Sequence, residues 1–195
     1  VGFSDVLASG GSSEEDQRNY FRIIQSNSDL LLRLINDILD LSRLEANKVI
    51  LTPEDCDVVQ LCRQALSSVE MSRRESGNRF VFETKTDSFV LQTDIQRLQQ
   101  VLINLLTNAA KFTKNGTITL QFEVEKEKNR VLFAVADTGC GIPKEKQKQV
   151  FERFEKLNEY AQGTGLGLSI CKLTVDKWGG DIWIDPDYEG GARFV

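Results

Sequence analysis

Hydrophobic residues in the first quarter of the chain recur at helical spacing. Between Glu14 and Ala46 the apolar positions advance in steps of three and four, with Asn27 in one polar slot: Ile24, Leu31, Leu34, Ile38 and Leu41. This heptad-like stripe predicts one long helix with a seam suited to packing against other helices. Ser12-Ser13, directly before it, offers an N-cap.

The residues before this helix have the pattern of a helix end. Phe3 and Leu7 lie at helical spacing, and Gly10-Gly11 would terminate the turn. Two helices joined by a short turn predict an antiparallel hairpin. Because two helices cannot bury so broad an apolar face, a second copy of the chain is the expected partner. The alternative is that the long helix packs only on its own domain.

Beyond Pro53 the pattern changes to a mixture of helical and strand-like segments. Helices are predicted over residues 57–74, 94–112, 144–154 and 165–178. Strands are predicted over residues 79–83, 89–91, 117–125, 131–136, 181–185 and 192–195. The chain therefore divides into a helical segment, 1–47, and a mixed α and β domain, 48–195.

Composition and charge narrow the functional classes. A net charge of −5 disfavours non-specific binding to nucleic acid or to an anionic membrane, and no apolar run is long enough to cross a bilayer. The absence of histidine excludes a Ser-His-Asp triad and a histidine base within the chain. The cysteines form no CxxC pair and are interpreted as reduced thiols of a cytosolic protein, not zinc ligands: Cys56, Cys62, Cys140 and Cys171.

Three polar residues share one face of the predicted helix over 94–112. Asn104, Asn108 and Lys111 follow one another at intervals of four and three, whereas leucines and alanines between them supply a buried face. Amide oxygens suit a Mg²⁺ ion that keeps several waters, and lysine suits phosphate as a mobile point charge. The alternative for each asparagine is a purely structural role, capping or bridging a loop.

A carboxylate and two glycine-rich segments complete the candidate chemistry. Asp137 ends a predicted buried strand and could accept a hydrogen bond from the amino group of adenine; guanine presents a carbonyl oxygen there, which leaves the carboxylate without a donor. The alternative is that Asp137 only caps the turn. Gly139 and Gly141 follow it, and a second set precedes the helix predicted from residue 165, whose N-terminus would attract anions: Gly163, Gly165 and Gly167.

The second glycine segment fits neither of two common nucleotide motifs. The Walker pattern GxxxxGK[ST] is absent, and a polar stretch, 158–162, stands where a dinucleotide-binding fold would have a strand. That stretch is interpreted as a short mobile lid.

Taken in order, four clusters resemble the N box, first glycine box, F box and second glycine box of histidine kinases in the GHKL ATPase superfamily. They are Asn104–Phe112, Asp137–Pro143, Phe151–Phe154 and Gly163–Leu168. The resemblance extends from about Pro53 to the last residue. It implies an α+β fold: a two-layer sandwich with helices on one face of a mixed sheet. Residues 1–47 resemble the dimerisation and phosphotransfer hairpin, without the box that carries the phosphoacceptor histidine.

The resemblance also implies roles for individual residues. Asn108 would bind Mg²⁺, Lys111 would contact phosphate, Asp137 would anchor adenine and Phe112 would flank the base, while Phe151 and Phe154 would pack beneath the lid. The remaining nucleotide contacts would come from the glycine segments: Gly139, Gly141, Ile142, Gly163, Thr164, Gly165, Leu166, Gly167 and Leu168. Asn104 and Lys111 would be the catalytic positions.

Asn104 distinguishes the kinases from their ATP-hydrolysing relatives. Gyrase, MutL and the large heat-shock chaperone carry a glutamate one turn before the Mg²⁺ ligand, where it activates water. A carboxamide cannot take a proton at neutral pH, so direct ATP hydrolysis is expected to be poor.

The resemblance therefore implies a cytoplasmic, ATP- and Mg²⁺-binding histidine kinase region. It would act as a homodimer and pass phosphate, through a histidine outside this chain, to a response regulator receiver domain. The parent protein could still be anchored in the inner membrane, although this segment would not touch it. The alternatives are an ATP-binding regulatory module without transfer activity and a GHKL ATPase.

Overall fold

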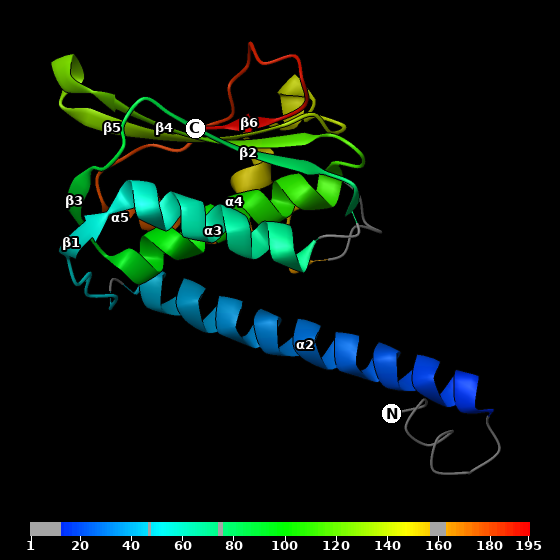
Figure 1. The fold of residues 1–195 in the computed structure, drawn as a ribbon. Coiled ribbons are helices and arrows are strands. Elements are labelled where there is room, and N and C mark those ends of the chain that lie inside the picture. Colours follow the sequence, from blue (N-terminus) through cyan, green and yellow to red (C-terminus); the bar gives the residue numbers. More distant parts are fainter. Residues whose placement is uncertain (1–12, 47, 74–75, 157–162) are drawn as a thin grey trace.

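The computed structural model describes residues 13–46, 48–73, 76–156 and 163–195 (Figure 1). A long helix lies beneath a domain in which a layer of helices covers one face of a sheet. This arrangement confirms the α+β fold with helices on one face of a mixed sheet. The helix expected within residues 1–10, and hence the complete hairpin, falls outside the described residues.

Helix α2 (Glu14–Glu45) is the long helix that the heptad-like pattern predicts. Ser13 is its N-cap, and the hydroxyl of Ser13 accepts a hydrogen bond from the Asp16 backbone N–H at 3.2 Å. The side-chain amide of Asn27 donates to the Ile23 carbonyl one turn earlier in the same helix, at 2.8 Å. Leu31 and Ile38 of the apolar stripe remain exposed within the described structure, together with three further apolar residues of α2: Leu32, Ile35 and Leu39.

The main sheet has four strands in the order β2-β4-β5-β6. They are β2 (Arg79–Thr84), β4 (Thr117–Glu125), β5 (Arg130–Asp137) and β6 (Arg193–Phe194). The β2–β4 pair is parallel, whereas β4–β5 and β5–β6 are antiparallel. The strands predicted over 117–125 and 131–136 are confirmed, and they pair as a hairpin. Alternate residues of β4 point into the core, as period-two patterning requires: Ile118, Leu120 and Phe122.

Helices α3 (Val58–Ser72), α4 (Ile95–Phe112) and α5 (Gly167–Lys177) form the helical layer. Asp57 caps α3 by accepting from Val59 and Gln60, and Asp94 caps α4 by accepting from the Arg97 backbone N–H at 3.0 Å. Their apolar faces meet the sheet in one continuous core. The leucines of α4 are almost completely buried in it: Leu102, Leu105 and Leu106.

Four details of the sequence prediction are wrong or incomplete. Strand β1 (Glu54–Asp57), which pairs with β3 (Val90–Thr93) in a separate two-stranded sheet, is missing from the prediction. The predicted helix over 144–154 is replaced by two short 3₁₀ turns, η3 (Lys144–Lys146) and η4 (Gln149–Phe151). Highly charged residues give this stretch too few apolar positions to hold a longer helix on the core.

The other two details concern the last fifty residues. Helix α5 begins at Gly167 instead of residue 165, because Gly165 adopts φ +73°, which a right-handed helix does not allow. Within 181–185 only an isolated bridge between Ile184 and Phe194 forms. A further 3₁₀ turn, η2 (Lys126–Lys128), connects β4 to β5.

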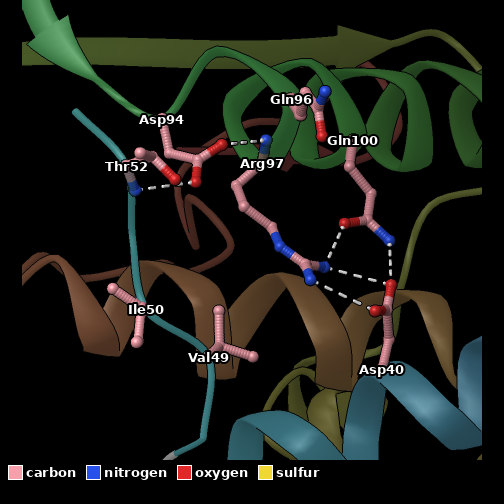
Figure 2. Close-up of a pocket in the computed structure, with 8 residues that line it drawn as sticks. All are labelled: Asp40, Val49, Ile50, Thr52, Asp94, Gln96, Arg97 and Gln100. Carbon is pink, nitrogen blue, oxygen red and sulfur yellow. Dashed lines mark hydrogen bonds and ion pairs between the residues drawn. The ribbon is translucent and has the colours of Figure 1, made fainter. Parts of the chain in front are cut away.

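Helix α2 docks on the helical layer near its C-terminal end. Leu41 and Leu44 pack with Leu166 and Ile170 in a small cluster separate from the main core. Beside this cluster lies a polar cavity of about 440 Å³ between α2 and the start of α4 (Figure 2). Within the described part of the chain, no helix combines the length and hydropathy needed to span a membrane.

The core position of α4 leads to a stability prediction. Leu106→Ala is expected to lower the free energy of unfolding by about 2–5 kcal/mol, because it leaves a cavity at a fully buried site. Met71→Ala, on the exposed surface of α3, is the control and should change it by less than about 1 kcal/mol. Urea unfolding followed by circular dichroism measures both; equal destabilisation would contradict the assignment of the core.

Candidate nucleotide-binding site

Helix α4 presents the three polar residues along one edge, as their spacing predicts. Asn104, Asn108 and Lys111 are each half-buried, whereas the leucines between them are buried in the core. The amide of Asn104 donates to the Gly167 carbonyl at 3.4 Å and thus links α4 to the first turn of α5. Among the described residues, the side chain of Asn108 has no hydrogen-bond partner, so its amide is available to a ligand.

Lys111 lies in a cluster of positive charge. Burial lowers the pKa of Lys111, and the nearby cations Lys156 and Arg73 lower it further. Within the described residues Lys111 forms no ion pair; its ammonium lies 4.7 Å from the centre of the Phe112 ring. These neighbouring cations contribute a local positive field that favours a polyanion.

Sequence reasoning missed Lys156 and Arg73. Lys156 lies just beyond the F box, and Arg73 is the C-terminal cap of α3, some forty residues before Lys111. Neither belongs to a motif, so only the tertiary structure brings them to Lys111.

Asp137 is the last residue of β5 and is only 4% exposed. Its Oδ1 atom accepts two backbone hydrogen bonds, from Gly139 at 2.8 Å and from Ala192 at 3.3 Å. Burial raises the pKa of Asp137, whereas these two donors and the hydroxyl of Thr113 act in the opposite direction. Both backbone donors converge on Oδ1, and no backbone N–H of the described residues donates to Oδ2.

A second buried polar group lies beside this carboxylate. Thr113 is 1% exposed, and its hydroxyl makes no hydrogen bond of normal geometry to any described residue, although it is near enough to lower the pKa of Asp137. A buried hydroxyl without a partner costs about 1–3 kcal/mol. The carboxylate of Asp137 and the hydroxyl of Thr113 therefore form a pair of polar groups suited to a ligand with its own donors and acceptors.

The first glycine segment allows the backbone to approach this pair closely. A Cβ atom at Gly139 would lie 2.4 Å from the Phe112 carbonyl oxygen and 2.9 Å from Asp137 Oδ1. Any other residue at Gly139 would push the end of α4 away from β5. Ile142, the next apolar residue of this segment, is partly buried against the main core.

The second glycine segment also lies close to α4, beside Lys111. A Cβ atom at Gly163 would lie 3.2 Å from the Lys111 ammonium. Gly165 adopts φ +73°, and its carbonyl accepts from the Phe154 backbone N–H at 2.9 Å, which fixes the F box against the loop. Leu166 is fully buried, while Leu168 packs on the main core.

The structure thus brings the four sequence clusters together around the end of α4. Phe112 is 38% exposed beside Lys111. The aromatic residues of the F box behave differently: Phe151 packs edge-on against Phe194 in the core, whereas Phe154 is 60% exposed. Residues 158–162, predicted as a lid, fall outside the described residues.

The cysteines form no disulfide bonds. All four are free, and only Cys140 is exposed. Burial raises the pKa of Cys171 to about 12, so this thiol is neutral and unreactive at ordinary pH. Among the described residues there is no cluster of three or more cysteines and carboxylates that could hold a metal ion.

Comparison with known proteins agrees with this arrangement. The family described as histidine kinase-, DNA gyrase B-, and HSP90-like ATPase matches residues 93–195, more than half of the chain, and the His Kinase A (phospho-acceptor) domain matches residues 1–47. The circadian input-output histidine kinase CikA of Synechococcus elongatus is 37% identical over 204 residues; the match covers all of this chain and 27% of that kinase. The chain thus spans about a quarter of the length of this relative.

Two solved structures share the fold. Full-length ShkA in complex with AMPPNP has a TM-score of 0.80 at 31% identity, over 94% of this chain and 38% of ShkA. Histidine kinase ThkA in complex with the response regulator TrrA has a TM-score of 0.77 at 28% identity, over 99% of this chain and 54% of that one. The chain belongs to the histidine kinase-, DNA gyrase B- and HSP90-like ATPase family, and within it to the sensor histidine kinases.

Proposed function

We propose that this chain is the ATP-binding catalytic region of a two-component sensor histidine kinase. It positions ATP so that the γ-phosphate passes to a histidine outside this chain, and the phosphate is then relayed to an aspartate of a response regulator. The observation that carries the proposal is the convergence on the end of α4 of a cation cluster and a carboxylate–hydroxyl pair.

The carboxylate–hydroxyl pair fits an adenine base. Asp137 Oδ2, to which no backbone N–H of the described residues donates, can accept from the exocyclic amino group. The Thr113 hydroxyl, which is buried without a hydrogen-bond partner among the described residues, can hydrogen-bond a ring nitrogen. Phe112, exposed at the same end of α4, is placed to flank the base. Guanine would put a carbonyl oxygen opposite the carboxylate, which gives the site a preference for ATP.

The cation cluster fits the triphosphate. Lys111 and its neighbours Lys156 and Arg73 supply positive charge, and the backbone of Gly163 lies beside the Lys111 ammonium. Two further sets of residues are proposed to contact the nucleotide. Gly139 and Gly141 belong to the first glycine segment, and residues 164–168 belong to the second.

Magnesium is assigned to Asn108. This amide has no partner among the described residues, and a single protein oxygen suits a Mg²⁺ ion whose other ligands are waters and phosphate oxygens. When bound, the ion neutralises developing charge on the phosphates.

Asn104 argues for a kinase and against an ATPase. It occupies the position one turn before Asn108, where it donates to the Gly167 carbonyl and offers no group that can take a proton from water. A kinase gains from this, because water near the γ-phosphate is not activated. Asn104 therefore acts through position: it holds the start of α5, and so the phosphate loop, against α4.

The proposed partners follow from α2 and from the relatives. The exposed apolar stripe of α2 would pair with a second copy of the chain, as the match to the His Kinase A domain supports. The structural likeness to ThkA bound to TrrA supports a receiver domain as the recipient of phosphate. We place this region in the cytoplasm, where ATP and such regulators are found.

A first prediction concerns the base. Asp137→Asn is expected to weaken Mg·ATP binding about 10-fold or more, because it replaces an acceptor with a group that faces the adenine amine with a donor in half of its orientations. Asp55→Asn, on the exposed surface of β1, removes the same charge and should leave the affinity unchanged. Isothermal titration calorimetry checks this; equal affinities in the two variants would refute the adenine site.

A second prediction tests phosphoryl transfer. The full-length parent protein, incubated with γ-labelled ATP, is expected to acquire acid-labile phosphate. Asn108→Ala should slow this by about 100-fold, because the metal ion supplies several kcal/mol of charge stabilisation. Asn19→Ala, on the exposed face of α2, is the control. ATP binding without phosphoprotein would support the regulatory alternative, and steady phosphate release without phosphoprotein would support the ATPase.

A third prediction uses the lowered pKa of Lys111. Only the protonated ammonium attracts phosphate, so ATP affinity should fall as pH rises through the pKa of Lys111. Because this pKa is lowered, the decline should begin at a lower pH than an ordinary lysine would give. Lys111→Arg should remove the alkaline decline, since a guanidinium stays charged. Affinity measured across this pH range is the readout, and an identical decline in both proteins would exclude Lys111 as its source.

A further inference from the structure

Helix α2 touches the phosphate loop directly through a carboxylate. The hydroxyl of Thr164 donates to Asp37 Oδ2 at 2.8 Å, across 127 positions of sequence. The same hydroxyl oxygen accepts the Leu166 backbone N–H at 3.3 Å. The Thr164 hydroxyl hydrogen is therefore already used in the bond to Asp37. The Thr164 oxygen in turn accepts from a backbone N–H of the glycine loop, so Asp37 is linked to that loop through Thr164.

Other contacts hold α2 in this place. Asp40, one turn after Asp37, accepts from Arg97 at 3.0 and 3.2 Å and from Gln100 at 2.9 Å, which ties α2 to the first turns of α4 (Figure 2). Glu45 forms an ion pair with Arg153 of the F box.

An apolar contact runs through the loop itself. Leu166, between Gly165 and Gly167, is 0% exposed because it packs with Leu41 and Leu44 of α2 and with Ile170. The fully buried apolar anchor of the loop that would receive the phosphates thus belongs to the cluster with α2 and not to the main core. Moving α2 would release both this anchor and the Thr164 hydroxyl.

We propose that docking of α2 on the second glycine loop, through Asp37, competes with the terminal phosphate of ATP for that loop. The inference rests on the proposed function, because it takes this loop as the phosphate site. A hydroxyl has one hydrogen to donate, so Thr164 serves either Asp37 or a phosphate oxygen. Asp37 also brings negative charge to this loop, in which Gly163 lies beside the Lys111 ammonium. A negative charge there repels the negatively charged phosphates of ATP.

The competition couples nucleotide and helix in both directions. If α2 docking weakens ATP binding by some factor, ATP binding weakens α2 docking by the same factor. ADP, which lacks the terminal phosphate, should compete less. The docked arrangement is then a resting state with the loop occupied by Asp37, and ATP loading frees the catalytic layer to move along α2.

The test compares Mg·ATP and Mg·ADP affinities by calorimetry in this chain and three single variants. Asp37→Asn keeps an oxygen that can accept from Thr164 but removes the charge, whereas Asp40→Asn leaves the loop untouched and weakens the contacts to Arg97 and Gln100. Asp29→Asn, an exposed position two turns earlier on α2, is the matched control for net charge. Asp37→Asn and Asp40→Asn are expected to tighten Mg·ATP about five-fold and Mg·ADP clearly less.

The outcomes separate this inference from the proposed function. Unchanged ATP affinity in Asp37→Asn relative to Asp29→Asn, or equal tightening for ATP and ADP, would overturn the competition while leaving the nucleotide site intact. If the unaltered chain binds no Mg·ATP, the proposed function itself fails. Hydrogen exchange gives an independent readout: the backbone of residues 37–45 should exchange faster with Mg·ATP than with Mg·ADP, and slower exchange with Mg·ATP would contradict the proposal.

Discussion

Helix α4 has to be core and binding surface at once, and the rest of the structure depends on this constraint. Its leucines are buried against the sheet, so the helix cannot rotate without exposing them. Because Asn104, Asn108 and Lys111 lie at fixed angles from those leucines, core packing holds the three polar side chains along one edge. The energy that fixes the proposed nucleotide site is therefore mostly the energy of burying apolar surface elsewhere on the same helix.

The sheet contributes in a different way. The register of β5 places Asp137 opposite Ile118 and beside the segment before β6, which supplies the Ala192 N–H. A carboxylate so deeply buried is stable only because backbone donors compensate for lost hydration. Since both donors bind one oxygen, the second oxygen keeps its capacity for a ligand. Folding thus leaves a polar group incompletely satisfied, which is characteristic of a binding site.

The proposed phosphate side of the site depends more on contacts from other elements. Its loop is held from α4 by Asn104, from the F box through Phe154, and from α2 through Asp37 and the leucine cluster. The main core holds the proposed adenine side, so the two halves of the proposed site are held in place by different parts of the structure. A change in the position of α2 would therefore reach the proposed phosphate side first and leave the proposed adenine side in place.

The sequence by itself determined most of the elements of this protein and indicated the residues of the proposed site. Strong periodicity fixed α2, α4 and the β4–β5 hairpin, because a long amphipathic pattern has few other ways to bury its apolar face. Residue spacing alone put Asn104, Asn108 and Lys111 on one edge, and motif order placed the glycine segments in the family. The prediction from sequence failed over 144–154, where the many charged residues leave no periodic apolar pattern. It also failed at β1, which is too short to show such a pattern.

Only the tertiary structure decided how distant segments meet. Arg73 and Lys156 join Lys111, Thr113 joins Asp137, and Asp37 reaches Thr164 across the chain. No local pattern encodes these contacts, since each arises from the packing of separate helices and loops on a shared core. Spacing along the chain specifies which face of an element a residue occupies; which other face it meets is set by the packing of the whole domain.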